Sequence, residues 1–300
     1  MRVVVSGASG LIGRHLVRHL RDEGHEVVTL VRREPRSPGE VRWDPAAGEL
    51  DPAALGTVDG AVNLSGAGVG DHRWTPAHKD LVMSSRVDST RTLVRALLAL
   101  DAPPAVLVNA SAIGAYGDAG EAVLTEAAPR GTGFLADVVA RWEEATAPAA
   151  EAGVRVALAR TGLLADPGGG AFGQLLTLFR LGLGGRLGDG RHWWSLISTP
   201  DEVAALTFLL QRPVAGPVNL ACPQPARNAE VTRALGRAVH RPAVLTVPPL
   251  ALRVALGEFA GEVTASQRVV PAALLRAGFR FQHPDAAAVT GWLAGAPSTG

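Results

Sequence analysis

The hydrophobic pattern changes period within the first twenty residues. Residues 3–5 are three consecutive valines, a β-branched run typical of a buried parallel strand. From Leu11 to Leu20 the apolar residues recur at three- and four-residue steps, which is the period of an amphipathic helix. The pattern therefore predicts a strand, a tight turn and a helix at the start of the chain.

Glycines occupy this turn at three-residue steps, Gly7, Gly10 and Gly13. The first allows the tight turn, the second lets a diphosphate approach the backbone, and the third lets the helix pack closely on the strand. The free N–H groups and positive dipole end of the helix would face the phosphates. The alternative is an ordinary glycine-rich loop, but the flanking strand and helix favour a dinucleotide cradle formed by Gly7, Ser9, Gly10, Leu11, Ile12 and Gly13.

A second strand is predicted over Glu26–Val31, and it ends at Arg32 and Arg33. In dinucleotide-binding folds this strand end meets the adenosine ribose, where an acid accepts the 2′-hydroxyl of NAD and an arginine accommodates the 2′-phosphate of NADP. Guanidinium–phosphate pairs are charge-assisted and often bidentate. We therefore expect NADP(H) as the cofactor, with a solvated basic loop as the alternative.

Further strands and helices alternate over the first 160 residues. Apolar runs predict strands over 59–64, 105–110 and 154–161, and helical periods predict helices over 75–100 and 134–152. The proline-rich segment 35–54 is predicted to be mainly loop. This alternation predicts an α/β fold with a doubly wound parallel sheet of the Rossmann type.

The second half of the chain is richer in glycine and in short elements. A short strand is expected within 191–198, helices over 200–210 and 228–240 with Asn228 as N-cap, and a strand over 218–220. We predict a nucleotide-binding domain over 1–165, to which 196–222 returns. The segments 166–195 and 223–300 would form a smaller C-terminal substrate lobe, and the tail 294–300 would be mobile.

Composition narrows the range of partners. The 300 residues are 47% hydrophobic and 19% charged, and the net charge is +1 with both signs mixed along the chain, so we expect no nucleic-acid partner. No apolar run approaches eighteen residues and no signal-peptide core precedes the first strand, which predicts a cytoplasmic protein without a membrane anchor. The single cysteine, Cys222, excludes an internal disulfide and multi-cysteine zinc sites. A small-molecule substrate is expected, and a homodimer is the oligomeric state to test.

Several segments together resemble the atypical, epimerase-family branch of the extended short-chain dehydrogenase/reductases. They span nearly the whole chain: SGASGLIG at 6–13, NLSG at 63–66, Trp74, Ser85-Arg86, SAIGAYGDAG at 111–120, GFLADVVARWE at 133–143, RLGLGGRLGDG at 180–190 and AGFRF at 277–281. The resemblance implies an NADP(H)-binding Rossmann domain and a C-terminal substrate lobe, and it implies no particular substrate. The remaining expected cofactor contacts lie at strand ends and on one helix, namely Leu64, Ser65, Gly66, Arg86, Ala110 and Thr161. Arg86 could instead reach the substrate, or be an exposed or salt-bridged arginine.

The proton-transfer pair of typical members, Tyr-x-x-x-Lys on one helix, is missing. Tyr116 is the only tyrosine and Lys79 the only lysine, and neither has its partner four residues away. The resemblance places the pair at Phe134 and Val138, whose side chains cannot transfer a proton. A second departure lies at 196–201, where the branch carries a Trp-Ile-His-x-Asp-Asp-like run and this chain has Ser198 at the histidine and Pro200 at the first acid.

Two residues remain as candidate catalytic groups, Ser111 and Tyr116, at the carboxyl edge of the predicted sheet. Ser111 could hydrogen-bond a substrate carbonyl or hydroxyl, or simply cap a loop. Tyr116 could be a relocated acid or an aromatic wall of the pocket. The run His192-Trp193-Trp194 could line the substrate mouth or serve packing, and Asp118, Glu121 and Glu126 are expected to be solvated loop acids.

Three functions stay open at this point. The first is an NADP(H)-dependent oxidoreductase or epimerase-like enzyme acting on a small organic substrate, with hydride chemistry supplied by the cofactor. The second is a non-catalytic NADP(H)-binding sensor or scaffold, which the missing Tyr-x-x-x-Lys pair favours. The third is a non-redox enzyme of a specialised pathway that uses the same fold.

Overall fold

The computed structural model describes residues 1–295, so most of the predicted mobile tail lies outside the described residues. An eight-stranded sheet has the strand order β13-β8-β6-β5-β1-β2-β3-β4. The pairs β1·β2, β1·β5, β2·β3 and β5·β6 are parallel, and the edge pair β3·β4 is antiparallel. The strands are β1 Arg2–Ser6, β2 Glu26–Val31, β3 Glu40–Asp44, β4 Glu49–Leu50, β5 Gly60–Asn63, β6 Val106–Ala112, β8 Arg155–Thr161 and β13 Gly216–Leu220.

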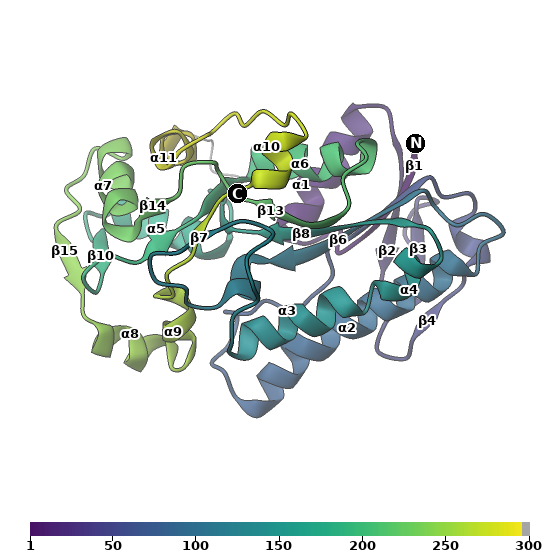
Figure 1. Cartoon of the computed structure of the whole chain (residues 1–300), viewed down its shortest axis with the longest axis horizontal. Helices are drawn as coiled ribbons and strands as arrows, with labels where there is room; N and C mark the ends of the chain where they lie inside the picture. The colour runs from purple at the N-terminus through teal and green to yellow at the C-terminus, as the bar shows by residue number, and fades with distance from the viewer. Residues whose placement is uncertain (296–300) are drawn as a thin grey trace. The chain divides into compact units, whose positions relative to one another are not determined.

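Helices cover both faces of this sheet, as a doubly wound fold requires. α1 (Leu11–Asp22) and the 203–211 part of α6 (Thr199–Gln211) lie on one face in Figure 1, and α2 (Pro76–Leu98), α3 (Phe134–Glu144) and α4 (Ala147–Glu151) lie on the other. Between α2, α4 and the sheet is a core that includes Val4, Leu93 and Leu107. The predicted α/β class and the doubly wound parallel sheet are confirmed.

Two predictions about the first half were incomplete or wrong. The segment 35–54 is rich in loop as predicted, but it also contains β3, β4 and the 3₁₀ turn η1 (Ala53–Leu55), because Val41 and Trp43 alternate with outward polar residues and extend the sheet. The predicted helix 134–152 is two helices, α3 and α4. The break precedes Pro148, whose nitrogen has no hydrogen to donate to the carbonyl four residues earlier.

Contacts divide the chain into two compact units. Unit 1 comprises 1–111, 137–160 and 203–218, and unit 2 comprises 112–136, 161–202 and 219–300. A core of its own, which includes Phe172, Trp194 and Leu235, stabilises unit 2. The boundaries of the nucleotide and substrate domains remain a prediction.

Unit 2 is built from short paired strands and short helices. The strand pairs are β7 (Val123–Leu124) with β16 (Arg268–Val269), β9 (Leu163–Ala165) with β12 (Leu196–Ser198), β10 (Gly185–Leu187) with β15 (Leu245–Val247), and β11 (Trp193–Trp194) with β14 (Ala226–Arg227). The other elements are η2 (Ile113–Tyr116), α5 (Gly170–Arg180), α7 (Asn228–Ala238), α8 (Pro249–Leu256), α9 (Phe259–Val263), α10 (Ala272–Arg276) and α11 (Ala286–Gly295).

Two details of unit 2 differ from the sequence predictions. The segment 191–198 is two strands, β11 and β12, which pair with different partners. Arg227, not Asn228, is the N-cap of α7, because the Asn228 Oδ1 atom accepts a hydrogen bond from the backbone N–H of Leu187 at 2.8 Å.

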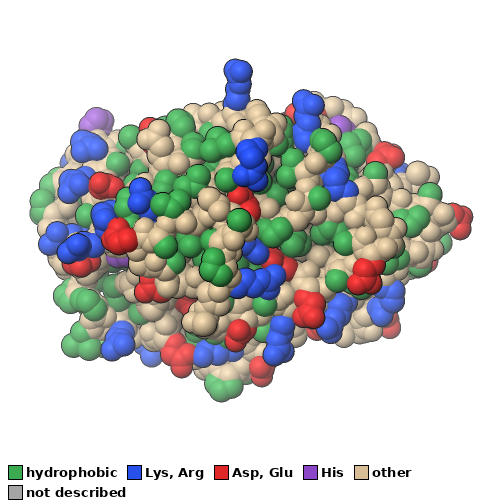
Figure 2. Space-filling view, viewed as in Figure 1, with side chains coloured by type: hydrophobic (Ala, Val, Ile, Leu, Met, Phe, Trp, Pro, Cys, Tyr) green, Lys and Arg blue, Asp and Glu red, His purple; other side chains and the backbone are tan. Residues whose placement is uncertain are grey.

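The surface and interior chemistry agree with a globular protein of mixed charge. Lys and Arg side chains are interspersed with Asp and Glu on the face shown in Figure 2. Within residues 1–295, no helix is long and apolar enough to span a bilayer, and no group of His, Cys, Asp and Glu side chains could hold a metal ion. Burial raises the pKa of the Cys222 thiol to about 12, so this thiol is not a nucleophile at neutral pH.

Two leucines of α2 that differ in exposure allow a matched test of stability. Leu93 is fully buried, whereas Leu81 on the same helix is 50% exposed. We expect Leu93→Ala to lower the free energy of unfolding by about 2–5 kcal/mol through lost burial and a cavity. Leu81→Ala should change it by no more than about 0.5 kcal/mol. Urea denaturation followed by circular dichroism measures both, and equal losses would contradict this packing.

Candidate cofactor and active site

The turn between β1 and α1 depends on three glycines with different neighbours. Gly7 has a φ of +68°, and a Cβ atom there would lie 2.6 Å from the carbonyl oxygen of Leu64. A Cβ atom at Gly13 would collide with the carbonyl oxygen of Gly7. At Gly10 a Cβ atom would meet only the Gly7 carbonyl oxygen, at 3.2 Å, and the residue is exposed. The first and third glycines therefore permit close packing, and the second leaves open space.

The amino end of α1 faces this open space without a capping side chain. Gly10 is the N-cap residue, and among the described residues no side chain caps the helix and no acid occupies its first turn. The first N–H groups of a helix have no intrahelical partner, and they carry the positive end of the helix dipole. The glycine cradle therefore fits a diphosphate, as the sequence predicts.

A buried polar network joins the strand ends behind the cradle. The Ser6 hydroxyl donates to Asn63 Oδ1 at 2.5 Å, and Asn63 Nδ2 donates to Thr90 Oγ1 at 2.8 Å and to Asn109 Oδ1 at 2.7 Å. Thr90 in turn donates to the Arg86 carbonyl oxygen at 2.8 Å. Because the three bonds of Asn63 join different elements, the network fixes the carboxyl ends of β1, β5 and β6 against α2.

The two arginines after β2 are not equivalent. Arg33 makes a bidentate ion pair with Glu40, with Nη1 to Oε2 at 2.8 Å and Nη2 to Oε1 at 2.6 Å. The Arg33 guanidinium and the backbone N–H of Arg36 lower the pKa of the Glu40 carboxyl to about 2. Arg32 is exposed and makes no hydrogen bond or ion pair with any residue that the structure describes. Of the two, only Arg32 has all its donors free for a phosphate.

Other predicted cofactor residues lie beside the turn. Leu64 and Ser65 follow β5, and the Leu64 carbonyl oxygen contacts Gly7 as described above. Gly66 lies against Arg86, because a Cβ atom there would be 3.1 Å from the Arg86 Cζ atom. Ala110 lies within β6 and is partly exposed. The structure therefore brings Gly7, Leu64, Gly66 and Arg86 together within unit 1.

Ser111 forms a buried chain with two charged residues. Its hydroxyl donates to Glu143 Oε1 at 2.6 Å, and Glu143 accepts from Arg160 Nε at 2.8 Å and from Arg160 Nη2 at 2.9 Å. All three residues are at most 4% exposed. Sequence reasoning singled out Ser111 but missed Glu143 and Arg160, although Glu143 ends the motif GFLADVVARWE and Arg160 stands next to Thr161.

Tyr116 has a different environment in unit 2. It is 2% exposed in a cluster with Ile113, Leu124 and Val269, and its hydroxyl donates to Asn219 Oδ1 at 2.7 Å. Asn219 Nδ2 donates to the Val270 carbonyl oxygen at 3.0 Å. The Tyr116 hydroxyl is thus buried and engaged by Asn219, which argues against a role as a relocated acid.

Thr161 pairs with a buried acid that sequence reasoning did not select. Its hydroxyl donates to Glu202 Oε1 at 2.7 Å, and Glu202 Oε2 is buried without a hydrogen-bond partner among the described residues. Burial raises the pKa of the Glu202 carboxyl to about 8, so it is mostly protonated at neutral pH. Glu202 lies in the first turn of α6, and the sequence alone did not indicate that its carboxyl is buried.

Ser198 stands where the family branch carries a histidine, and in the structure it contacts a histidine from elsewhere in the chain. Ser198 Oγ lies 2.8 Å from Nδ1 of His283, and Asp201 accepts the backbone N–H groups of Gln282 and His283 at 2.7 and 2.9 Å. A histidine from the C-terminal segment thus occupies the neighbourhood of the position where the resemblance expects one. The separation of 85 residues in the chain hid this contact from sequence reasoning.

Two guanidinium groups lie over the Trp193 ring, with Arg227 at 4.6 Å and Arg268 at 4.5 Å from the ring centroid. Its Nε1 atom donates to Glu121 Oε2 at 3.0 Å. Burial lowers the pKa of the neighbouring His192.

The three acids predicted to be solvated differ from one another. Asp118 accepts the backbone N–H of Ser266 at 3.0 Å, and Glu121 pairs with Arg227 at the surface. Glu126 was wrongly predicted to be solvated: its Oε1 atom accepts the backbone N–H groups of Asn219 and Ala273, both at 3.1 Å, and its Oε2 atom is buried.

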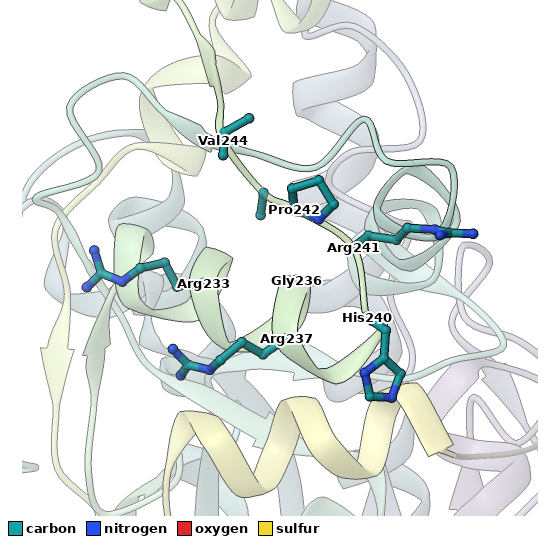
Figure 3. A pocket seen from close by; sticks show the side chains of 8 residues that line it. Arg233, Gly236, Arg237, His240, Arg241, Pro242 and Val244 are labelled. Atoms are coloured by element: carbon teal, nitrogen blue, oxygen red, sulfur yellow. The ribbon is translucent and has the colours of Figure 1, made fainter.

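A surface cavity of about 550 Å³ lies at the carboxyl end of α7. Arg233 and Arg237 extend from one side of the helix in Figure 3, and His240 and Arg241 follow it. None of the predicted site residues lines this cavity.

The doubly wound sheet and the glycine turn at β1 define a dinucleotide-binding fold of the Rossmann type. The profile of the NAD dependent epimerase/dehydratase family matches residues 3–221, and a domain of unknown function, DUF1731, matches residues 247–289. The chain belongs to the NAD dependent epimerase/dehydratase family, and the resemblance to its atypical short-chain dehydrogenase/reductase branch is confirmed.

Relatives cover nearly the whole chain. An epimerase family protein of Mycobacterium tuberculosis is 48% identical over 283 residues, which are 94% of this chain and 93% of the relative. The crystal structure of human epimerase family protein SDR39U1 (isoform 2) with NADPH superposes with a TM-score of 0.89 at 31% identity, over 98% of this chain and 99% of that chain. A nucleoside-diphosphate sugar epimerase from Corynebacterium glutamicum has a TM-score of 0.79 at 36% identity, over 98% of this chain and 58% of that chain.

The buried Glu202 carboxyl predicts a pH-dependent stability. Its pKa is about 8 in the folded protein and near the ordinary 4.5 in the unfolded chain, so between these values the folded state holds one proton more. The free energy of unfolding should therefore fall as the pH rises from 4.5 and level off above 8, by a few kcal/mol in total. Glu202→Gln should remove this part of the slope, and exposed Glu144→Gln should retain it. Parallel stability curves for wild type and Glu202→Gln, measured by urea denaturation from pH 5 to 8, would contradict the assignment.

Proposed function

We propose that the protein binds NADP(H) and acts as an oxidoreductase or epimerase-like enzyme on a small organic substrate. The observation that carries the proposal is the open glycine cradle at an uncapped helix end together with the unpaired Arg32 guanidinium after β2. The human relative crystallised with NADPH supports the phosphorylated nucleotide. A cytoplasmic setting and a homodimer remain predictions of the same proposal.

The predicted cofactor residues can be grouped by the part of the nucleotide that each would contact. Backbone N–H groups of residues 9–13 would hold the diphosphate, and Arg32 would hold the 2′-phosphate. Arg33 would contribute less, because Glu40 already neutralises it. Leu64, Ser65 and Gly66 would line the adenosine, and the parts played by Ala110 and Thr161 remain predictions.

The chemistry at Ser111 follows from its hydrogen bond to Glu143. A bound nicotinamide supplies or accepts the hydride. The Ser111 hydroxyl proton is already directed at Glu143, so its oxygen lone pairs are free to accept a hydrogen bond from a substrate hydroxyl. In oxidation Ser111 takes the substrate proton as it passes its own to Glu143, and Arg160 holds the carboxylate in place; reduction reverses both transfers.

The second candidate function is an NADP(H)-binding sensor without catalysis. Phe134 and Val138 occupy the positions of the proton-transfer pair, and Tyr116 is committed to Asn219. Cofactor binding without turnover of any substrate would favour this alternative.

The unequal environments of the two arginines predict unequal effects on binding. Arg32→Ala removes a charge-assisted bond worth about 1.5–3 kcal/mol, so NADPH affinity should fall about 10- to 100-fold while NADH affinity stays the same. Arg33→Ala should have a smaller effect on NADPH. Isothermal titration calorimetry measures both, and an equal loss of NADH and NADPH affinity in Arg32→Ala would overturn the 2′-phosphate assignment.

The hydrogen-bonded chain at Ser111 predicts a loss of rate without a loss of cofactor affinity. Ser111→Ala should slow single-turnover oxidation of bound NADPH by a carbonyl panel about 100-fold, because proton transfer is lost. Tyr116→Phe should keep the rate within a few-fold of wild type, since its hydroxyl serves packing. Stopped-flow absorbance at the NADPH band reports the rates. Full activity of Ser111→Ala would exclude this proton path.

A further inference from the structure

Arg86 is a partly buried cation, and among residues 1–295 no acid balances its charge. Its Nη1 atom donates to the carbonyl oxygens of Ala67 at 2.9 Å and of Val82 at 3.0 Å. Among residues 1–295 no carboxylate pairs with it, and its Nε and Nη2 atoms make no hydrogen bond. Burial lowers the pKa of the guanidinium to about 10, so it stays charged at neutral pH. The unbonded nitrogen atoms of Arg86 are not among the fully buried polar atoms, so they keep contact with solvent and are accessible to a ligand.

A second donor without an acceptor lies beside it. Trp142, on α3, is 5% exposed, and its Nε1 atom is buried with no hydrogen-bond partner among the described residues. The Arg86 guanidinium lies 5.0 Å from the centroid of the Trp142 ring, so the two groups share one location in unit 1. An unsatisfied buried N–H typically costs about 1–3 kcal/mol, and native structures rarely leave one without a reason.

The backbone that follows β5 packs against the Arg86 side chain. It offers no hydrogen-bond acceptor to the unbonded nitrogen atoms of Arg86 and Trp142. A Cβ atom at Gly66 would be 3.1 Å from both Cγ and Cζ of Arg86, so the glycine backbone lies directly on the side chain. The Ala67 carbonyl already accepts from Nη1, and the Ala67 N–H donates to Ser85 Oγ at 3.0 Å. The free polar atoms of Arg86 and Trp142 are therefore all donors.

A purely structural role explains only part of this arrangement. Bonds from Nη1 to two carbonyl oxygens, together with stacking on an indole, would fix α2 against the β5 end. They do not account for the Arg86 donors that have no carboxylate partner, or for the buried indole N–H left without an acceptor. An anionic group with several oxygen lone pairs would satisfy both.

We propose that Arg86 and Trp142 form a binding subsite for an anionic oxygen group, a carboxylate or a phosphate. The inference rests on the proposed function for the origin of the anion. The group is either a phosphate of the nucleotide cofactor or an anionic group of the substrate, which would then be an organic acid or a phosphate ester. The guanidinium fork and the neighbouring indole N–H would together supply donors for its oxygens.

The indole N–H resonance of Trp142 reports directly on this subsite. The chain has six tryptophans, and loss of one ¹⁵N-labelled indole peak in Trp142→Phe assigns the signal. Inorganic phosphate and acetate would be titrated into the free protein and into protein saturated with NADPH. A shift on adding NADPH alone identifies the cofactor as the source, and a shift only when anion is added to the NADPH complex identifies the substrate.

Variants of α2 separate the subsite from a general charge effect. Arg86→Gln should weaken the response of the Trp142 signal to anions at least tenfold. Arg86→Lys should give an intermediate response, because it retains the charge but not the forked guanidinium. Exposed Arg91→Gln should respond as the wild type does. If NADPH fails to bind the wild type, the proposed function is wrong. The phosphate titration of the free protein still shows whether Arg86 and Trp142 bind an anion. A Trp142 signal that neither NADPH nor anions move, or an Arg86→Gln response equal to wild type, would overturn the proposal.

Discussion

The close approach of backbone to backbone at the β1–α1 turn is the constraint on which the rest of the site depends. Gly7 lies against the Leu64 carbonyl, and Gly13 lies against the Gly7 carbonyl, at separations that exclude any side chain. This contact seats the amino end of α1 beside the ends of β1 and β5. The hydrogen bonds of Asn63 to Ser6, Thr90 and Asn109 then hold the neighbouring strand ends in register.

The charges around this edge of the sheet in unit 1 divide into two kinds. Arg33 and Arg160 have carboxylate partners, Glu40 and Glu143, and so serve to order local structure. Arg32 and Arg86 have none among the described residues; Arg32 is exposed and Arg86 is partly buried. Unpaired cations at the ligand-binding edge of a parallel sheet are suited to anionic ligands, and this distinction separates binding groups from positioning groups.

Local patterns were sufficient to predict the alternating elements and the glycine cradle, because each of these is encoded within a few residues. Strand β3, next to the edge strand β4, was missed because the prolines around it resembled a loop, although Val41 and Trp43 alternate as a strand should. The pairing of Ser111 with Glu143 and of Ser198 with His283 joins residues 32 and 85 positions apart, which no local pattern reveals. Likewise, the sequence shows two equal arginines at 32 and 33, and only the fold shows that Glu40 engages one of them.

A crystal of this chain soaked with NADPH would show whether the glycine turn holds the nucleotide. We expect density for the diphosphate against the backbone N–H groups at the amino end of α1, with the 2′-phosphate within hydrogen-bonding distance of Arg32. Density for the nucleotide elsewhere, or none at a concentration that saturates binding in solution, would contradict this expectation.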